Sequence, residues 1–192
     1  MNFSAIALTY LSAIIWILPP LKQYKTFFFK YFLILAISDI LDILFLNFFK
    51  MEFSYLYILI SFSLFIALQK EQYLKQKKIL FGGFGGVVVI LGFMKLGSGF
   101  TIFLLTFLHL MIIFRILYLF VMEVAQKQVI NFFYLVLAFY EFTVLLKFLN
   151  FLFELKVEAQ TYFYITTGFE LLVGIFYTTF REDSRKLVYQ LK

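Results

Sequence analysis

The hydrophobic positions of this chain form seven long apolar stretches separated by short polar segments. A helix needs about 20 predominantly apolar residues to cross the hydrocarbon core of a bilayer, and the stretches approach that length. They cover residues 3–21, 27–48, 53–69, 79–94, 99–122, 129–150 and 160–180. The pattern predicts an all-α, polytopic membrane protein with seven transmembrane helices, the first of them retained in the mature chain.

Composition agrees with this interpretation. Of the 192 residues, 64% are hydrophobic and only 15% are charged, whereas about a quarter of a typical soluble domain is charged. Seven crossings with tight connections use nearly the whole chain, so we expect residues 1–192 to form a single membrane domain. The chain has no cysteine, which excludes disulfides and thiolate metal sites.

The lysines and arginines predict the orientation in the membrane. Of the 17 Lys and Arg residues, eleven fall in segments on one side of the predicted spans and three on the other. The eleven are Lys22, Lys25, Lys70, Lys75, Lys77, Lys78, Lys127, Arg181, Arg185, Lys186 and Lys192, and the three are Lys50, Lys95 and Lys156. Because cytoplasmic segments carry the excess of Lys and Arg, we expect the N-terminus outside and the C-terminus in the cytoplasm.

The short fourth span, residues 79–94, carries Gly82 and Gly86. Small residues at this spacing let another helix approach closely, either within the bundle or at a subunit contact. Aligning the chain with itself at a shift of 102 residues places residues 33–39 on residues 135–141. This match suggests a 3+1+3 parallel repeat around the fourth span, although Leu- and Phe-rich helices also match by chance.

Ionisable side chains in the middle of the spans are the candidate functional residues, because a charge at the bilayer centre costs about 2.5–3.5 kcal/mol. They are Asp39, Asp42, His109, Arg115, Glu141 and Glu170. Counting along the helices places all but Asp42 and Arg115 at a similar depth. The cluster has two interpretations: ion pairs that fix helix packing, or a midplane site for a proton, a cation or a small polar ligand.

Several function classes have no motif here. The chain has no H-E-x-x-H, no G-x-S-x-G, no phosphate loop and no dinucleotide-binding glycine motif. We therefore expect no enzymatic activity, no cofactor and no metal site. The last span has no lysine to attach retinal, so a retinal protein is excluded. The net charge of +6 is explained by cations at the membrane boundary, and we expect no nucleic-acid partner.

One stretch carries a resemblance to a transporter family. Residues 17–26 read ILPPLKQYKT and resemble the Pro-Gln motif of PQ-loop and SWEET-like transporters, with Pro20 in place of the glutamine. The resemblance implies three helices, a linker helix and three further helices, with the N-terminus outside and a small solute as substrate.

The whole chain is also similar to small seven-helix inner-membrane proteins of the Bacteroidetes type. The shared features are the Phe-, Ile- and Lys-rich composition, the lysine-bearing first loop, and a final span that ends in GIFYTTFREDS at residues 174–184. The resemblance implies a bacterial inner-membrane location.

Two functions follow from these expectations. The first is a non-enzymatic protein that acts through partners, as a receptor-like sensor or a subunit of an inner-membrane complex, with the basic tail of residues 181–192 as a cytoplasmic contact. The alternative is a small-solute or proton-coupled transporter that uses the ionisable cluster.

Overall fold

The computed structural model describes residues 3–44, 54–69, 98–153 and 159–191, and it is mostly helical. The elements are α1 (Phe3–Trp16), α2 (Leu18–Lys22), α3 (Phe29–Leu44), α4 (Ser54–Ala67), α6 (Ser98–Lys127), β1 (Val129–Asn131), α7 (Phe132–Leu152), α8 (Ala159–Thr179), the 3₁₀ turn η3 (Arg185–Leu187) and β2 (Val188–Gln190). The predicted span at residues 79–94, with Gly82 and Gly86, lies outside the described residues.

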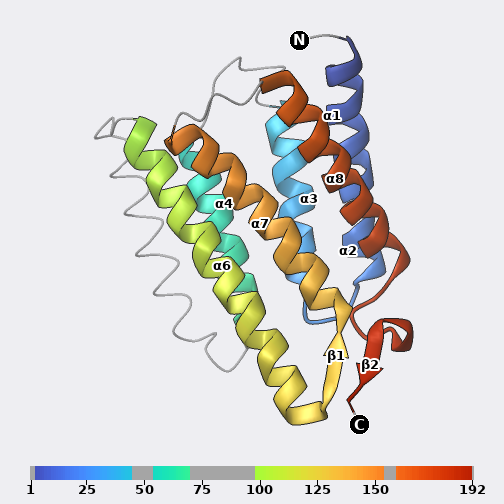
Figure 1. The fold of residues 1–192 in the computed structure, drawn as a ribbon. Coiled ribbons are helices and arrows are strands. Elements are labelled where there is room, and N and C mark those ends of the chain that lie inside the picture. Colours follow the sequence, from blue (N-terminus) through green and yellow to red (C-terminus); the bar gives the residue numbers. More distant parts are fainter. Residues whose placement is uncertain (1–2, 45–53, 70–97, 154–158, 192) are drawn as a thin grey trace.

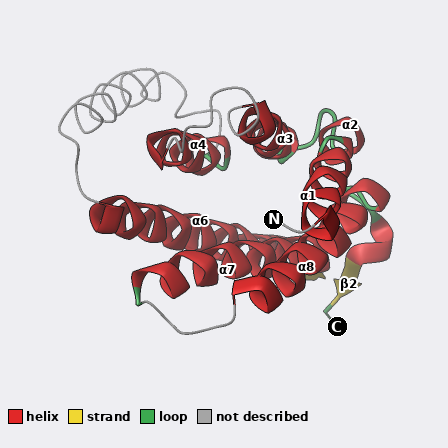
Figure 2. Cartoon of the chain, turned by 90° about the horizontal axis from the view of Figure 1, so that it is seen from above, coloured by secondary structure: helices red, strands yellow, loops and turns green. Residues whose placement is uncertain are grey.

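The long helices form a bundle of two rows. Seen from above, α6, α7 and α8 lie side by side in one row, α4 and α3 form the other, and α1 closes the bundle next to α8 (Figure 2). The start of α1 and strand β2 lie at opposite ends of the bundle (Figure 1). The two short strands are at the same end as α2, where the first loop, the end of α6 and the tail meet.

Two of the described helices are long and apolar enough to cross a membrane. They cover Gly99–Lys127, with a mean hydropathy of 2.3, and Phe132–Leu152, with a mean hydropathy of 1.8. The helices in the first three predicted spans are shorter, with 14 residues in α1, 16 in α3 and 14 in α4. The helical character is confirmed. Among the described residues, two of the seven expected crossings are helices long and apolar enough to span a membrane.

The first predicted span is not one continuous helix, because α1 ends at Trp16 and α2 begins at Leu18. Pro19 and Pro20 lie in the first turn of α2, where a missing backbone N–H removes no helical bond from that helix. In a continuous helix they would leave carbonyls of the preceding turn without donors. The two prolines therefore account for the break.

The sixth predicted span begins three residues later than expected, because a short strand precedes its helix. Helix α6 runs to Lys127, and Gln128 then adopts a left-handed conformation with φ of 55°. Residues 129–131 form β1, which pairs antiparallel with β2 in the tail and aligns Ile130 with Tyr189. The Asn131 side chain accepts a hydrogen bond from the Phe133 N–H at 3.1 Å and begins α7.

The bundle is held by an aromatic core toward its α2 end. Its buried rings are Trp16, Phe28, Tyr31, Phe32, Phe133, Tyr134, Tyr140 and Tyr177. Ring centroids lie 4.7 Å apart in the pair of Phe32 with Tyr177 and 4.8 Å apart in the pair of Trp16 with Tyr140. Such tilted and edge-on pairs stabilise packing beyond the area they bury, and they join α1, α3, α7 and α8.

The outer faces of the long helices are apolar. Phe114 is 60% exposed on α6, Phe139 is 64% exposed on α7, and Leu172 is 68% exposed on α8. A soluble monomer rarely exposes contiguous apolar surface on this scale. These faces suit a surrounding of lipid or of other apolar helices.

Helices α1 and α8 contact each other at Gly174. A Cβ atom built on Gly174 would lie 2.6 Å from Ile15 Cγ2 and 3.6 Å from the Trp16 ring. Only a residue without a side chain fits there unless Ile15 moves. The small residue that permits close helix contact in the described structure is therefore Gly174.

Candidate functional site

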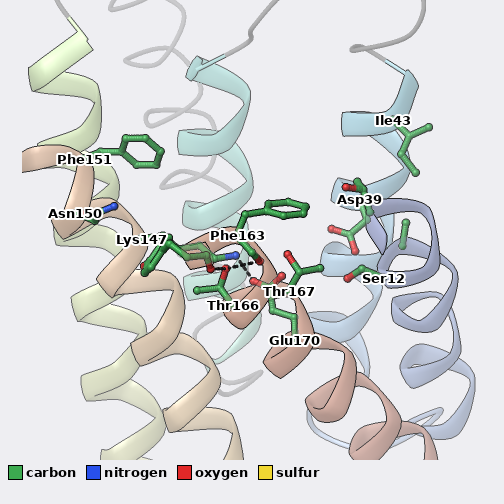
Figure 3. A pocket seen from close by; sticks show the side chains of 13 residues that line it. Ser12, Asp39, Ile43, Lys147, Asn150, Phe151, Phe163, Thr166, Thr167 and Glu170 are labelled. Atoms are coloured by element: carbon green, nitrogen blue, oxygen red, sulfur yellow. Dashed lines mark hydrogen bonds and ion pairs between the residues drawn. The ribbon is translucent and has the colours of Figure 1, made fainter. Parts of the chain in front are cut away.

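A cavity with a mostly apolar wall and several charged and hydroxyl groups opens between α1, α3, α7 and α8 and is our candidate binding site. Its volume is about 450 Å³, within the range of small-molecule sites. The lining residues are Thr9, Ser12, Ala13, Asp39, Ile43, Lys147, Asn150, Phe151, Tyr162, Phe163, Thr166, Thr167 and Glu170. Figure 3 shows Asp39 and Ser12 on one side of the cavity, facing Lys147 and Glu170 on the other. The cavity thus combines charged groups, hydroxyls and aromatic rings.

An ion pair lies in the cavity wall. The Lys147 ammonium on α7 donates to the Glu170 carboxylate on α8, and their side chains are 28% and 16% exposed. Asp39 adds a second carboxylate from α3. With all three ionised, the wall carries one negative charge in excess, which favours a cationic or zwitterionic ligand.

Two polar atoms of the wall are buried without a hydrogen-bond partner. They are the amide oxygen of Asn150 and the hydroxyl of Tyr162, and both residues line the cavity. Buried polar groups are nearly always hydrogen-bonded in folded proteins, and an exception calls for an explanation. Because both atoms are inaccessible to solvent, a ligand in the cavity would reach them only after the wall rearranges.

A second polar cluster lies in the packed interior and joins four helices. The Tyr31 hydroxyl on α3 donates to Glu141 Oε1 on α7. The other carboxylate oxygen, Glu141 Oε2, lies 2.7 Å from His109 Nδ1 on α6. His109 Nε2 lies 3.0 Å from Ser61 Oγ on α4. All four side chains are buried, so a continuous chain of hydrogen bonds crosses the bundle away from solvent.

The six predicted site residues therefore divide among three places. His109 and Glu141 meet directly, whereas Asp39 and Glu170 line the cavity. The fifth, Arg115, donates through Nε to the Leu68 carbonyl at 3.1 Å and lies over the Tyr118 ring. It satisfies a carbonyl at the end of α4. The side chain of Asp42, in α3, lies outside the described residues.

Sequence reasoning did not include Tyr31, Ser61 or Lys147 among the site residues. Lys147 lies near the end of a predicted span, where a lysine is normally expected to reach the interface. No spacing in the sequence indicates its ion-pair partner, because that partner lies on another helix. Ser61 shares a polar face of its predicted span with Ser54 and Tyr57, which was a signal. Tyr31 has no such signal, because one tyrosine in an apolar helix is common.

A third network holds the tail against the body at the other end of the bundle. Gln23 is fully buried, and its Nε2 donates to the carbonyls of Tyr177 at 3.1 Å and Phe180 at 2.7 Å. Its Oε1 accepts from the Glu182 N–H at 3.1 Å. One side chain of the first loop therefore caps the end of α8 and fixes the start of the tail.

Glu182 connects the tail to two further elements. Its carboxylate accepts from the Phe27 N–H at 3.1 Å and from the Tyr134 hydroxyl at 3.2 Å. Its carbonyl accepts from Asn131 Nδ2 at 3.1 Å. Burial raises the pKa of this carboxyl above its usual value, while the two donors act in the opposite direction.

Comparisons of the chain with protein-family models, with curated proteins and with solved structures find no match.

Proposed function

We propose that this protein is a multi-pass membrane protein of a bacterial inner membrane that binds a small polar solute in the cavity and carries it across. The observation that carries the proposal is the charged cavity inside a bundle whose outer faces are apolar. A hollow whose wall holds an ion pair and a further carboxylate suits a solute site better than a role in packing alone.

The charge distribution supports the expected orientation in the membrane. The cations in the first loop, at the end of α6 and in the tail lie at the β1–β2 end of the bundle (Figure 1). They are Lys22, Lys25, Lys127, Arg181, Arg185 and Lys186. If that end is cytoplasmic, then the cavity lies toward the outer half, because late residues of α3 and α7 line it together with residues from the middle of α1 and from the early and middle parts of α8.

Helix neighbours support the proposed 3+1+3 repeat. In such a repeat α1, α3 and α4 correspond to α6, α7 and α8. Exchanging the two halves converts a contact of α1 with α8 into a contact of α6 with α4, and both contacts occur. Lys25 and Gln128, in the turns after the first helix of each half, both have positive φ, of 66° and 55°. The cavity then lies between the halves, where repeat transporters bind substrate.

Uptake into proteoliposomes tests the proposal. The probes are a panel of radiolabelled small zwitterions and small amines. We expect saturable uptake by the wild type and a loss of at least about tenfold in the double variant Lys147→Met with Glu170→Gln, which removes both charges together and leaves no unpaired ion. The exposed-face variant Phe139→Leu is the matched control on α7 and should retain uptake.

Two outcomes would count against transport: uptake of the entire panel at the rate of protein-free liposomes, or full uptake by the double variant.

The competing function is a sensor or complex subunit that acts through a protein partner. The exposed aromatic face of α6, with Phe103 and Phe114, supports it, because such a face could pack on another membrane protein. Purification in mild detergent separates the two: a defined complex favours the subunit, and a monomer favours the transporter.

A further inference from the structure

The hydrogen bonds around His109 have a property that a merely structural pair does not need. Glu141 Oε1 already accepts from Tyr31, so Oε2 is left for His109 Nδ1 at 2.7 Å. A carboxylate only accepts, and therefore Nδ1 carries the hydrogen that is donated to it. The remaining ring nitrogen, Nε2, faces the hydroxyl of Ser61 at 3.0 Å.

A hydroxyl can serve Nε2 in either charge state of the ring. In the neutral imidazole Nε2 accepts, and the Ser61 O–H donates to it. After a proton is added at Nε2, the ring donates and Ser61 Oγ accepts through a rotation of its hydroxyl. The chain from Tyr31 to Ser61 therefore keeps every hydrogen bond whether or not His109 is protonated.

The surroundings supply the countercharge for a protonated ring. The titratable groups that face the carboxylate of Glu141 are Tyr31 from α3, His109 from α6, Tyr177 from α8 and its own neighbour Tyr140. Three of these are phenols, so among them only His109 can neutralise Glu141 by gaining a proton. The face of the Phe148 ring, 5.2 Å from the imidazole centre, also favours a cation there.

The same helices carry this cluster and the solute cavity. Along α3, Asp39 follows Tyr31 by eight residues, which is about 12 Å of helix. Along α7, Lys147 follows Glu141 by six residues, or about 9 Å. A shift of α3 or α7 that changes the cavity therefore also changes the distances around Glu141.

We propose that His109 and Glu141 form a proton-binding site that is separate from the solute cavity and coupled to it through α3 and α7. One proton from water adds to His109 Nε2, the imidazole becomes imidazolium, and the Glu141 carboxylate balances its charge. The coupling rests on the proposed transport function, whereas the proton site itself does not.

His109 is the only histidine of the chain, so ¹⁵N labelling of histidine gives a single imidazole to observe by NMR in lipid nanodiscs. When the pH is lowered from about 8 to about 5, we expect the ring signals to change from those of the neutral Nδ1–H tautomer to those of imidazolium. Ser61→Ala should lower the proton-binding constant by roughly tenfold, because the charged ring loses the stronger hydrogen bond. Phe139→Leu, on the exposed face of α7, is the control and should leave the titration in place.

A ring that keeps one charge state across this range in the wild type would overturn the proton site, and no variant is needed for that result. A titration unchanged in Ser61→Ala would also contradict it. If the ring titrates while the wild type transports no probe, the proton site stands and the proposed transport fails. If uptake of a probe has the same pH dependence in Ser61→Ala as in the wild type, the coupling fails.

Discussion

The docking of the tail depends on Gln23, and its replacement by alanine gives a quantitative prediction. The side chain is fully buried and makes three hydrogen bonds, two donated to the carbonyls of Tyr177 and Phe180 and one accepted from the Glu182 N–H. Each group left unsatisfied costs about 1 kcal/mol or more, and the lost Cγ methylene adds about 0.8 kcal/mol. We expect Gln23→Ala to lower the free energy of unfolding by about 4 kcal/mol.

Thermal unfolding followed by circular dichroism in detergent measures this loss, and limited proteolysis of the tail shows where it acts. Lys22→Ala is the matched control, because Lys22 is the exposed neighbour on α2 and should change stability by less than about 0.5 kcal/mol. Gln23→Glu should be at least as damaging as alanine. It keeps the shape and the acceptor but removes both donors and places a negative charge at the C-terminus of α8.

The reasoning is refuted if Gln23→Ala unfolds within about 1 kcal/mol of the wild type and its tail stays as resistant to protease. That result would mean that the strand pairing and the Glu182 contacts hold the tail without the glutamine. A stable Gln23→Glu variant would refute the argument about donors in the same way.

Three further predictions concern packing, pH and the cavity. Gly174→Ala should lower the unfolding temperature, since its Cβ would meet Ile15 at 2.6 Å, and adding Ile15→Ala should restore it. Burial raises the pKa of Glu182 above its ordinary value of 4.5, so tail docking should be strongest below pH 4.5 and weaken as the pH rises through the raised pKa. Hydrogen exchange of β2 measures this change, and Glu182→Gln should remove the pH dependence. A double-mutant cycle on the melting of Lys147→Met and Glu170→Gln should give a favourable coupling of about 1 kcal/mol, and additive losses would contradict the ion pair.

The sequence identified the ionisable residues inside the bundle, but it did not predict which of them meet. Asp39, His109, Glu141 and Glu170 were expected at a similar depth, and the structure places them in two separate polar sites. Position along a helix follows from counting at a fixed rise per residue. Which helices face one another, and which side each presents, depends on tertiary packing. The single predicted cluster was therefore the part that counting could not resolve.

The short sheet shows the same limit for the fold. The strand β1, residues 129–131, is apolar and directly precedes α7, so its pattern could not be distinguished from the start of a helix. What makes it a strand is its pairing with β2, close to 60 residues later in the chain. The break at Pro19 and Pro20 was predictable because its cause lies within one turn of the chain.

The fixed tail also changes how the two candidate functions compare. A basic tail suited to a cytoplasmic partner was one reason to expect a sensor or a complex subunit. In the structure that tail packs against the helical bundle: Glu182 contacts the first loop and α7, Leu187 is buried, and β2 pairs with β1. A partner that binds it through these groups has to displace them.

The contacts of the tail also bear on transport, because they close the cytoplasmic end of the bundle in the proposed orientation. In the proposed orientation the cavity lies toward the outer side of the bundle, whereas the aromatic core and the Gln23–Glu182 network fill its cytoplasmic side. A solute bound in the cavity, between the two repeats, could then reach the cytoplasm only after that network opens. Of the interactions that close this end, the hydrogen bonds of Gln23 join the first loop to α8 and the tail, which belong to opposite halves of the proposed repeat. Weakening Gln23 should therefore affect the passage of solute as well as stability, and Gly174→Ala, which loosens the bundle at a different place, separates the two effects.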